Sequence, residues 1–154
     1  MFNDREWKNL ITLDIDPKCN PDIPHDLNDL PYPFRDNEFN EIHAYEVLEH
    51  CGTQGDWKYF FNQFSEFWRI LKPDGMFFAT VPQWNALWAF GDPGHTRIIN
   101  QGTLVFLSQK EYEKQIGKTA MTDYRYVYRA DFDIELSETN KGTFIFALKA
   151  RKEN

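Results

Sequence analysis

An aspartate, a histidine and an arginine lie close together in a segment rich in Trp, Gly and Pro, and we predict Asp92, His95 and Arg97 to be catalytic residues. The His95 imidazole could take a proton from an attacking oxygen or nitrogen, and Arg97 could pair with a carboxylate or phosphate of a bound molecule. The competing interpretation is that the sequence DPGH forms a turn, in which Asp92 or His95 satisfies local backbone groups. Trp84 and Trp88 would then be core residues.

A second candidate site is the acidic pair Asp14 and Asp16, which lies at the end of a β-rich run at residues 10–15. In an open α/β sheet, ligands bind beyond the carboxyl ends of the strands, where a carboxylate can accept hydrogen bonds from both hydroxyls of a ribose. Asp14 is the better candidate of the two. The simpler alternative is that the two acids and Pro17 only end the strand.

The spacing of apolar residues predicts the elements that would hold these sites. Residues 56–71 carry large apolar side chains every three or four positions, with polar residues such as Gln63 mostly opposite, and so predict an amphipathic helix whose apolar face is core. Residues 76–81 are short, apolar and bounded by Gly and Pro, which predicts a buried strand. Residues 21–50 predict two further short strands around a Pro-rich turn.

The C-terminal third predicts one helix and one pair of strands. Ser108 and Glu111 have the spacing of a capping box, which predicts a short helix over residues 109–116. Residues 122–138 contain alternating apolar patches, and residues 142–151 form a strong strand pattern. The turn-forming sequence SETNKG lies where these two segments meet, so we expect an antiparallel hairpin.

Four phrases of this sequence, in this order and spacing, resemble a class I S-adenosylmethionine-dependent methyltransferase. They are LDIDP at Leu13, HDLNDLPYPF at His25, DNEFNEIHAYEVLEH at Asp36 and ILKPDGMFFATVP at Ile70. The resemblance covers residues 10–82 well and is looser beyond them. It implies a Rossmann-like α/β sheet with helices on its faces, a C-terminal antiparallel hairpin and S-adenosylmethionine as cofactor.

The resemblance also implies roles for individual residues at the strand ends. Glu49 and His50 complete a recurring phrase that is more often structural, because it orients the loop before the helix. The implied cofactor-binding residues are Asp14 with Asp16 beside it for the ribose, Asp26 and the backbone of Leu27 for the adenine, and Ala44, Tyr45 and Glu46 for the sulfonium and methionine portion.

The Gly-rich loop that opens this family's cofactor site is absent. Its glycines let backbone amides approach the methionine carboxylate, yet the first glycine of this chain is Gly52. We therefore expect a single, N-terminally incomplete domain without the usual first strand, which normally lies between the LDID and IHAY strands. These two strands could pair directly, a second chain could fill the gap, or the gene could begin late within a longer one. A gap left open is the least favourable arrangement, since unpaired buried backbone groups are costly.

Composition limits the remaining possibilities. The 154 residues suffice for one domain with a real core, and the net charge of −7 argues against a dedicated nucleic-acid-binding protein. Cys19 and Cys51 have no metal-binding spacing, and no metal is expected. The sequence shows neither a signal peptide nor a membrane span, so we expect a cytoplasmic protein.

Two classes of function follow from these observations. The first is methyl transfer to an O or N nucleophile of a small molecule, sugar or protein, because the strand end AYEV lacks the NPPY-like motif of DNA amino-methylating enzymes. The second is a catalytically inactive methyltransferase fold that serves as a partner-binding or oligomerisation module, or that binds an adenosyl ligand without transferring methyl. Uncovered sheet edges and the aromatic surplus favour a homo-oligomer.

Overall fold

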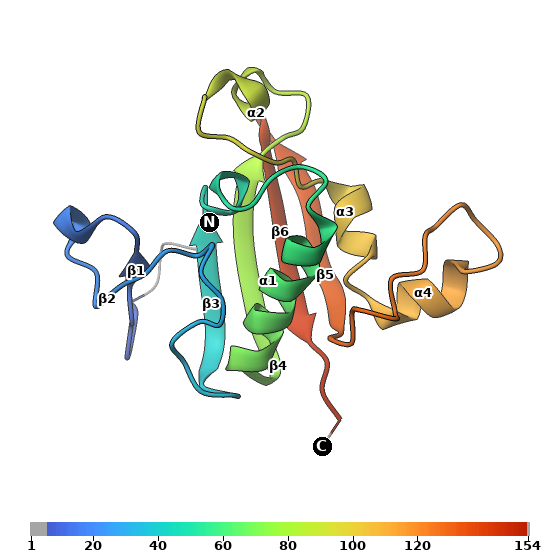
Figure 1. The fold of residues 1–154 in the computed structure, drawn as a ribbon, viewed down its shortest axis with the longest axis horizontal. Coiled ribbons are helices and arrows are strands. Elements are labelled where there is room, and N and C mark those ends of the chain that lie inside the picture. Colours follow the sequence, from blue (N-terminus) through green and yellow to red (C-terminus); the bar gives the residue numbers. More distant parts are fainter. Residues whose placement is uncertain (1–5, 154) are drawn as a thin grey trace.

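The computed structural model describes residues 6–153, and its main feature is a four-stranded sheet in the order β3–β4–β6–β5 (Figure 1). The strands β3 and β4 run parallel, whereas β6 is antiparallel to both β4 and β5. The predicted C-terminal hairpin is thus confirmed, and Lys141 and Gly142 turn it with φ angles of 50° and 84°, as a two-residue hairpin turn with positive φ requires. The strand bounds are Phe39–Tyr45 (β3), Leu71–Pro82 (β4), Phe132–Asn140 (β5) and Thr143–Ala150 (β6).

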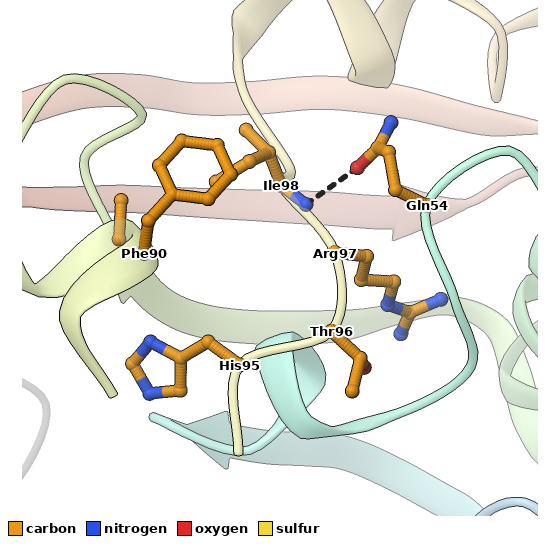
Figure 2. A pocket seen from close by; sticks show the side chains of 7 residues that line it. Gln54, Phe90, His95, Thr96, Arg97 and Ile98 are labelled. Carbon is orange, nitrogen blue, oxygen red and sulfur yellow. Dashed lines mark hydrogen bonds between the residues drawn. The ribbon is translucent and has the colours of Figure 1, made fainter. Parts of the chain in front are cut away.

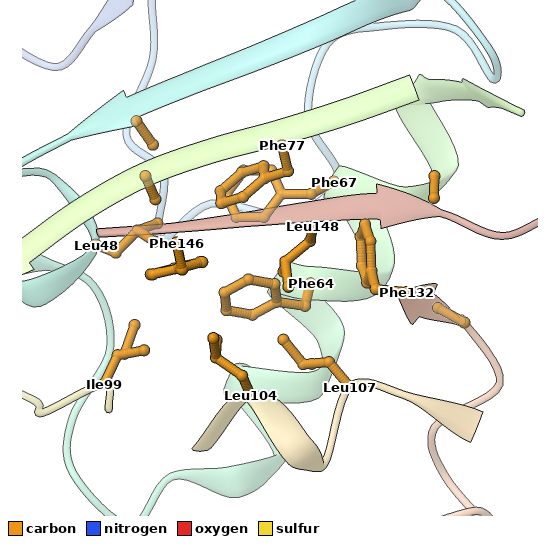
Figure 3. Close-up of a cluster of buried hydrophobic side chains, with 14 of the residues drawn as sticks. Leu48, Phe64, Phe67, Phe77, Ile99, Leu104, Leu107, Phe132, Phe146 and Leu148 are labelled. Atoms are coloured by element: carbon orange, nitrogen blue, oxygen red, sulfur yellow. The ribbon is translucent and has the colours of Figure 1, made fainter. Parts of the chain in front are cut away.

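The long helix α1 (Trp57–Ile70) covers one face of this sheet. Its bounds agree with the helix predicted from the apolar spacing, and the Asp56 side chain caps it by accepting a hydrogen bond from the Tyr59 N–H at 3.1 Å. Its apolar face is core as predicted, and Figure 3 shows the contact with the sheet. The Phe64 and Phe67 rings lie 5.8 and 4.6 Å from the Phe77 ring of β4.

Three short helices follow β4 along the chain: α2 (Leu87–Gly91), α3 (Gln101–Val105) and α4 (Gln109–Gln115). Leu104 of α3 and Leu107 complete the core beneath α1 (Figure 3). The helix α4 lies where it was predicted, but the predicted capping box is wrong, because the Ser108 side chain makes no cap hydrogen bond. Instead the Gln109 N–H donates to Asp131 Oδ1 at 2.9 Å.

The N-terminal strands form a separate, two-stranded sheet. The run predicted at residues 10–15 is a strand only at β1 (Leu13–Asp14), which pairs in parallel with β2 (Ile23–Pro24). Among residues 6–153 no strand joins this pair to β3, so the two strands that flank the missing one do not pair directly (Figure 1). The N-terminal segment nevertheless reaches the main sheet, since the Trp7 ring lies edge-on to His43 of β3 at 4.4 Å. Two residue pairs make up the described β1–β2 ladder, so only a few backbone groups at its edges would need a partner from a further strand.

Candidate functional site

The parallel strands β3 and β4 end at the same edge of the sheet, and two connecting segments are tied together there. After β3, Glu46 adopts a φ of 54° and donates its N–H to the Thr80 carbonyl at 2.9 Å. The chain then forms the short 3₁₀ helix η2 (Leu48–His50). The Thr96 N–H donates to the Glu49 carbonyl at 2.8 Å, which brings the segment after β4 alongside η2. The predicted catalytic residues therefore lie beside the end of β3.

Asp92 and His95 form the turn that the simpler interpretation of DPGH predicted. Asp92 Oδ1 accepts a hydrogen bond from the Gly94 N–H at 2.8 Å, and the His95 N–H donates to the Asp92 carbonyl at 3.0 Å. The His95 side chain is 8% exposed, and its Nδ1 lies 2.6 Å from the Trp88 carbonyl. The expectation that Trp84 and Trp88 are core on this interpretation is wrong, because they are 51% and 64% exposed. The catalytic roles of Asp92 and His95 stay predictions.

Arg97 lies inside the protein. Its Nε donates to the Leu48 carbonyl at 2.7 Å and its Nη2 donates to Gln63 Oε1, while the guanidinium lies over the Tyr59 ring at 5.7 Å. Burial lowers the pKa of Arg97, because the charged form loses its hydration there. The predicted contact of Arg97 with an acceptor stays a prediction, and the burial of this guanidinium argues against it.

Gln63 is a residue whose part in this site the sequence did not reveal. The helical spacing placed it on the polar face of α1, but its side chain is fully buried. Its Oε1 accepts from Arg97 and its Nε2 donates to the Tyr32 hydroxyl at 3.1 Å. The helical period could not show that Gln63 is buried, because its amide is stabilised there by Arg97, which comes 34 positions later in the chain.

A cavity of about 240 Å³ opens beside this arrangement (Figure 2). Phe90, His95 and Ile98 are among its lining residues, as is Gln54, whose Oε1 accepts a hydrogen bond from the Ile98 N–H at 2.7 Å. Phe90 itself is 76% exposed. The cavity therefore offers an apolar wall and one imidazole to a small group that enters from solvent.

The predicted adenosine-binding residues lie on the β1–β2 unit and the segment after it. The acidic side chains of Asp14, Asp16 and Asp26 each accept a hydrogen bond from a backbone N–H two residues ahead, at 2.8 to 2.9 Å. These turns support the simpler interpretation of Asp14 and Asp16, but each of the three carboxylates has a second oxygen for a ligand. The Leu27 carbonyl accepts from the hydroxyls of Tyr32 and Tyr59, both at 2.9 Å, which fastens this segment to α1.

The predicted sulfonium-binding residues end β3. Ala44 is buried and pairs in register with Ala79 of β4. The Tyr45 hydroxyl contacts Nδ1 of His43, and Glu46 follows at the turn. The structure thus brings these residues together with the Asp92 to Arg97 segment at one sheet edge, while their contact with a cofactor stays a prediction.

Glu49, His50 and His95 form a cluster, although the resemblance gave Glu49 and His50 a mainly structural role and only His95 was predicted to be catalytic. The His50 and His95 rings lie nearly perpendicular with centroids 4.7 Å apart, and His50 Nδ1 is 3.0 Å from the Gly94 carbonyl. Glu49 is only 3% exposed. Burial, helped by the neighbouring Glu46 carboxylate, raises the pKa of Glu49 to about 8. The three residues supply ligand atoms within 4.8 Å of one another.

Comparison with known proteins supports the resemblance seen in the sequence. The family described as "Methyltransferase domain" matches residues 5–79. A SAM-dependent methyltransferase from Archaeoglobus fulgidus superposes with a TM-score of 0.51 at 14% identity, over 91% of this chain and 74% of that one. A candidate methyltransferase from Bacillus halodurans C-125 gives a TM-score of 0.50 at 14% identity, over 96% and 83%.

A third similar structure is a chain in the complex of the Haloferax volcanii Trm112 methyltransferase activator with a candidate methyltransferase. Its TM-score is 0.44 at 18% identity, and this chain covers only 60% of that one with 83% of its own length. No curated protein matches the sequence. Within residues 6–153 no helix is both long enough and apolar enough to cross a membrane.

Proposed function

Because this chain has the class I, Rossmann-like methyltransferase fold, we propose that it binds S-adenosylmethionine and transfers its methyl group to an O or N nucleophile of a small molecule, sugar or protein. The observation that carries this proposal is the meeting of the β3 end, with Tyr45 and Glu46, and the His95 segment at one edge of the sheet. In open α/β sheets the ligand binds at this edge.

The residues present fit one half of the cofactor. Asp14 and Asp26 offer exposed or half-buried carboxylates to the hydroxyl and amino groups of an adenosine. Among the residues that the structure describes, these carboxylates are the groups proposed to recognise the cofactor, and they address its adenosine.

When bound, S-adenosylmethionine supplies an electrophilic methyl carbon, to which the acceptor's lone pair forms a bond as the C–S bond breaks and its electron pair goes to sulfur. His95 is the proposed proton acceptor for this reaction. Its Nδ1 carries the proton donated to the Trp88 carbonyl, so the Nε2 lone pair can take the proton of an acceptor O–H or N–H. Phe90 and Ile98 give the cavity an apolar wall beside this imidazole.

The binding step can be tested by calorimetric titration with S-adenosylmethionine and its demethylated product. Asp14→Asn keeps an oxygen for the turn with the Asp16 N–H but removes the carboxylate, so we expect binding to weaken at least tenfold. Asp29→Asn removes the same charge from an exposed side chain nearby and should bind like the natural chain. Equal affinities for the two variants, or no heat at millimolar ligand, would contradict the proposal.

A second candidate function is a catalytically inactive fold that binds a protein partner or its own copy. The favouring observation is a group of exposed large apolar side chains on and beside α2, which are Trp84, Leu87, Trp88 and Phe90. Exposed apolar side chains of this size, gathered in one segment, suit a docking surface. Sedimentation of the purified chain distinguishes the two, because a Trp88→Ser variant should change the oligomeric state only in the second case.

A further inference from the structure

We propose that Glu49, His50 and His95 bind a divalent first-row transition-metal ion through one carboxylate and two imidazoles. This inference concerns a site at the same sheet edge, but it does not depend on methyl transfer. It rests on three independent observations about the cluster: the spacing of its ligand atoms, the hydrogen bonds that orient both imidazoles, and an unpartnered carboxylate oxygen.

The ligand atoms of Glu49 and His50 have the spacing that a single ion requires, and a ligand atom of His95 lies close to them. Two ligands that bind one such metal at roughly 2.1 Å lie about 3 to 4 Å from each other. His50 Nε2 is 3.9 Å from Glu49 Oε1, and the ligand atoms of all three residues lie within 4.8 Å. The distance between His50 and Glu49 is too long for a hydrogen bond. These atoms therefore face one another without being bonded to one another.

Backbone carbonyls orient both imidazoles toward the cluster. His50 Nδ1 lies 3.0 Å from the Gly94 carbonyl, and His95 Nδ1 lies 2.6 Å from the Trp88 carbonyl. A carbonyl can only accept, so Nδ1 carries the proton in both rings and each Nε2 keeps a lone pair for a metal. A Cβ at Gly94 would lie 3.2 Å from His50 Nδ1, so glycine gives this ring the room it needs.

The buried carboxylate of Glu49 lacks a partner for one oxygen. Within the described part of the chain, Oε2 of Glu49 makes no hydrogen bond, although the residue is only 3% exposed. The nearby cation, Arg97, directs Nε to the Leu48 carbonyl and Nη2 to Gln63, and among residues 6–153 its buried Nη1 has no hydrogen-bond partner either. Asp92 adds a further carboxylate 3.5 Å from His95 Nε2. A cation bound by the Glu49 carboxylate, whose Oε1 lies nearer His50, would balance the carboxylates around it and reduce the cost of leaving Oε2 without a partner.

The ligand set indicates the class of ion. Imidazole nitrogens favour Zn²⁺, Fe²⁺, Ni²⁺ or Cu²⁺ over Mg²⁺ and Ca²⁺, which prefer oxygen ligands. Three protein ligands leave at least one coordination position open. His95 also lines the cavity, so a metal there could receive an acceptor oxygen and lower the pKa of its hydroxyl. In a metal-loaded protein His95 Nε2 is a ligand, and the metal replaces it in activating the acceptor.

The test is titration of chelator-treated protein with Zn²⁺ by calorimetry and with Co²⁺ by visible absorption. We expect one ion per chain, Co²⁺ bands of a His-ligated site, and much weaker binding of Mg²⁺. Glu49→Gln and His50→Gln should each weaken Zn²⁺ binding at least tenfold. His25→Gln makes the same change outside the cluster, at a ring bonded to the Asp29 carbonyl, and should leave affinity unchanged.

Circular dichroism of each variant separates loss of binding from loss of folding, and His50→Gln serves if Glu49→Gln fails to fold. Binding of less than one ion per chain overturns the inference, as do Glu49→Gln and His50→Gln proteins that bind Zn²⁺ like the natural chain. The titration with S-adenosylmethionine is independent, so failure of metal binding with intact cofactor binding would leave the proposed function standing.

Discussion

Replacing Gln63 with leucine should destabilise the protein strongly, although the two side chains are similar in size. Gln63 is fully buried, and the substitution removes its bond from the charged Arg97 and its bond to the Tyr32 hydroxyl. A hydrogen bond to a charged group contributes about 1.5–3 kcal/mol and a neutral one about 1 kcal/mol, so we expect a loss of roughly 2.5–4 kcal/mol. Asn62→Leu on the exposed side of α1 is the matched control and should stay within about 0.5 kcal/mol.

The assay is thermal unfolding followed by circular dichroism, with urea unfolding as a second measurement. For 154 residues the unfolding entropy is about 0.32 kcal/mol per degree, so Tm should fall by roughly 8–12 °C. Adding Arg97→Met removes the buried guanidinium that Gln63→Leu leaves without its acceptor. The double variant should therefore recover part of the lost free energy of unfolding. A fall in Tm of less than about 2 °C for Gln63→Leu would refute the reasoning, since the buried guanidinium would then not depend on this amide.

Other substitutions test the core and the caps. Phe64→Ala, at a fully buried ring, should cost about 3–5 kcal/mol in urea unfolding, whereas Phe90→Ala at an exposed ring should cost less than about 0.5 kcal/mol; similar losses would contradict the assigned core. Asp131→Ala should lower the free energy of unfolding by about 1 kcal/mol, because it removes the acceptor for the Gln109 N–H, and Ser108→Ala should lower it by less. A larger loss for Ser108→Ala than for Asp131→Ala would instead support the capping box. Burial raises the pKa of Asp131, so its neutral form is favoured in the folded state. The natural chain should therefore lose stability relative to Asp131→Asn as the pH rises from the ordinary pKa of 3.8 through the raised one, and a pH-independent difference in urea midpoints would contradict this.

The sequence predicted the elements whose apolar pattern is local. The three-and-four spacing within residues 56–71 located α1 to within one residue of each end, because burial of one helical face demands that period. The C-terminal hairpin followed in the same way from two apolar runs around a turn. The helix α1 and the hairpin strands contribute their apolar residues to the same core, and each shows its own local period, which is why local reasoning sufficed.

The features that the sequence did not predict depend on residues far apart in the chain. Gln63 is acceptable inside the core only because Arg97 and Tyr32 meet it there. Asp131, rather than Ser108, caps α4 from 22 residues away. The aromatic density around Trp88 suggested core, but nothing in the described structure covers that ring fully. Composition and hydrophobic periodicity indicate which side chains favour burial. They do not indicate which residue, far away in the sequence, will pair with a buried polar group.

The separation of the β1–β2 pair from the main sheet has a consequence for ligand affinity. Hydrogen bonds between Thr12 and Asp22 hold the two segments of the pair to each other, while Leu10 and Ile15 remain 55% and 64% exposed. A unit that buries so little can open without unfolding the core. Any ligand held by Asp14 binds only the closed population, and a unit closed one tenth of the time weakens the apparent affinity tenfold. A partner or a ligand that closes this pair would thereby raise affinity without touching Asp14.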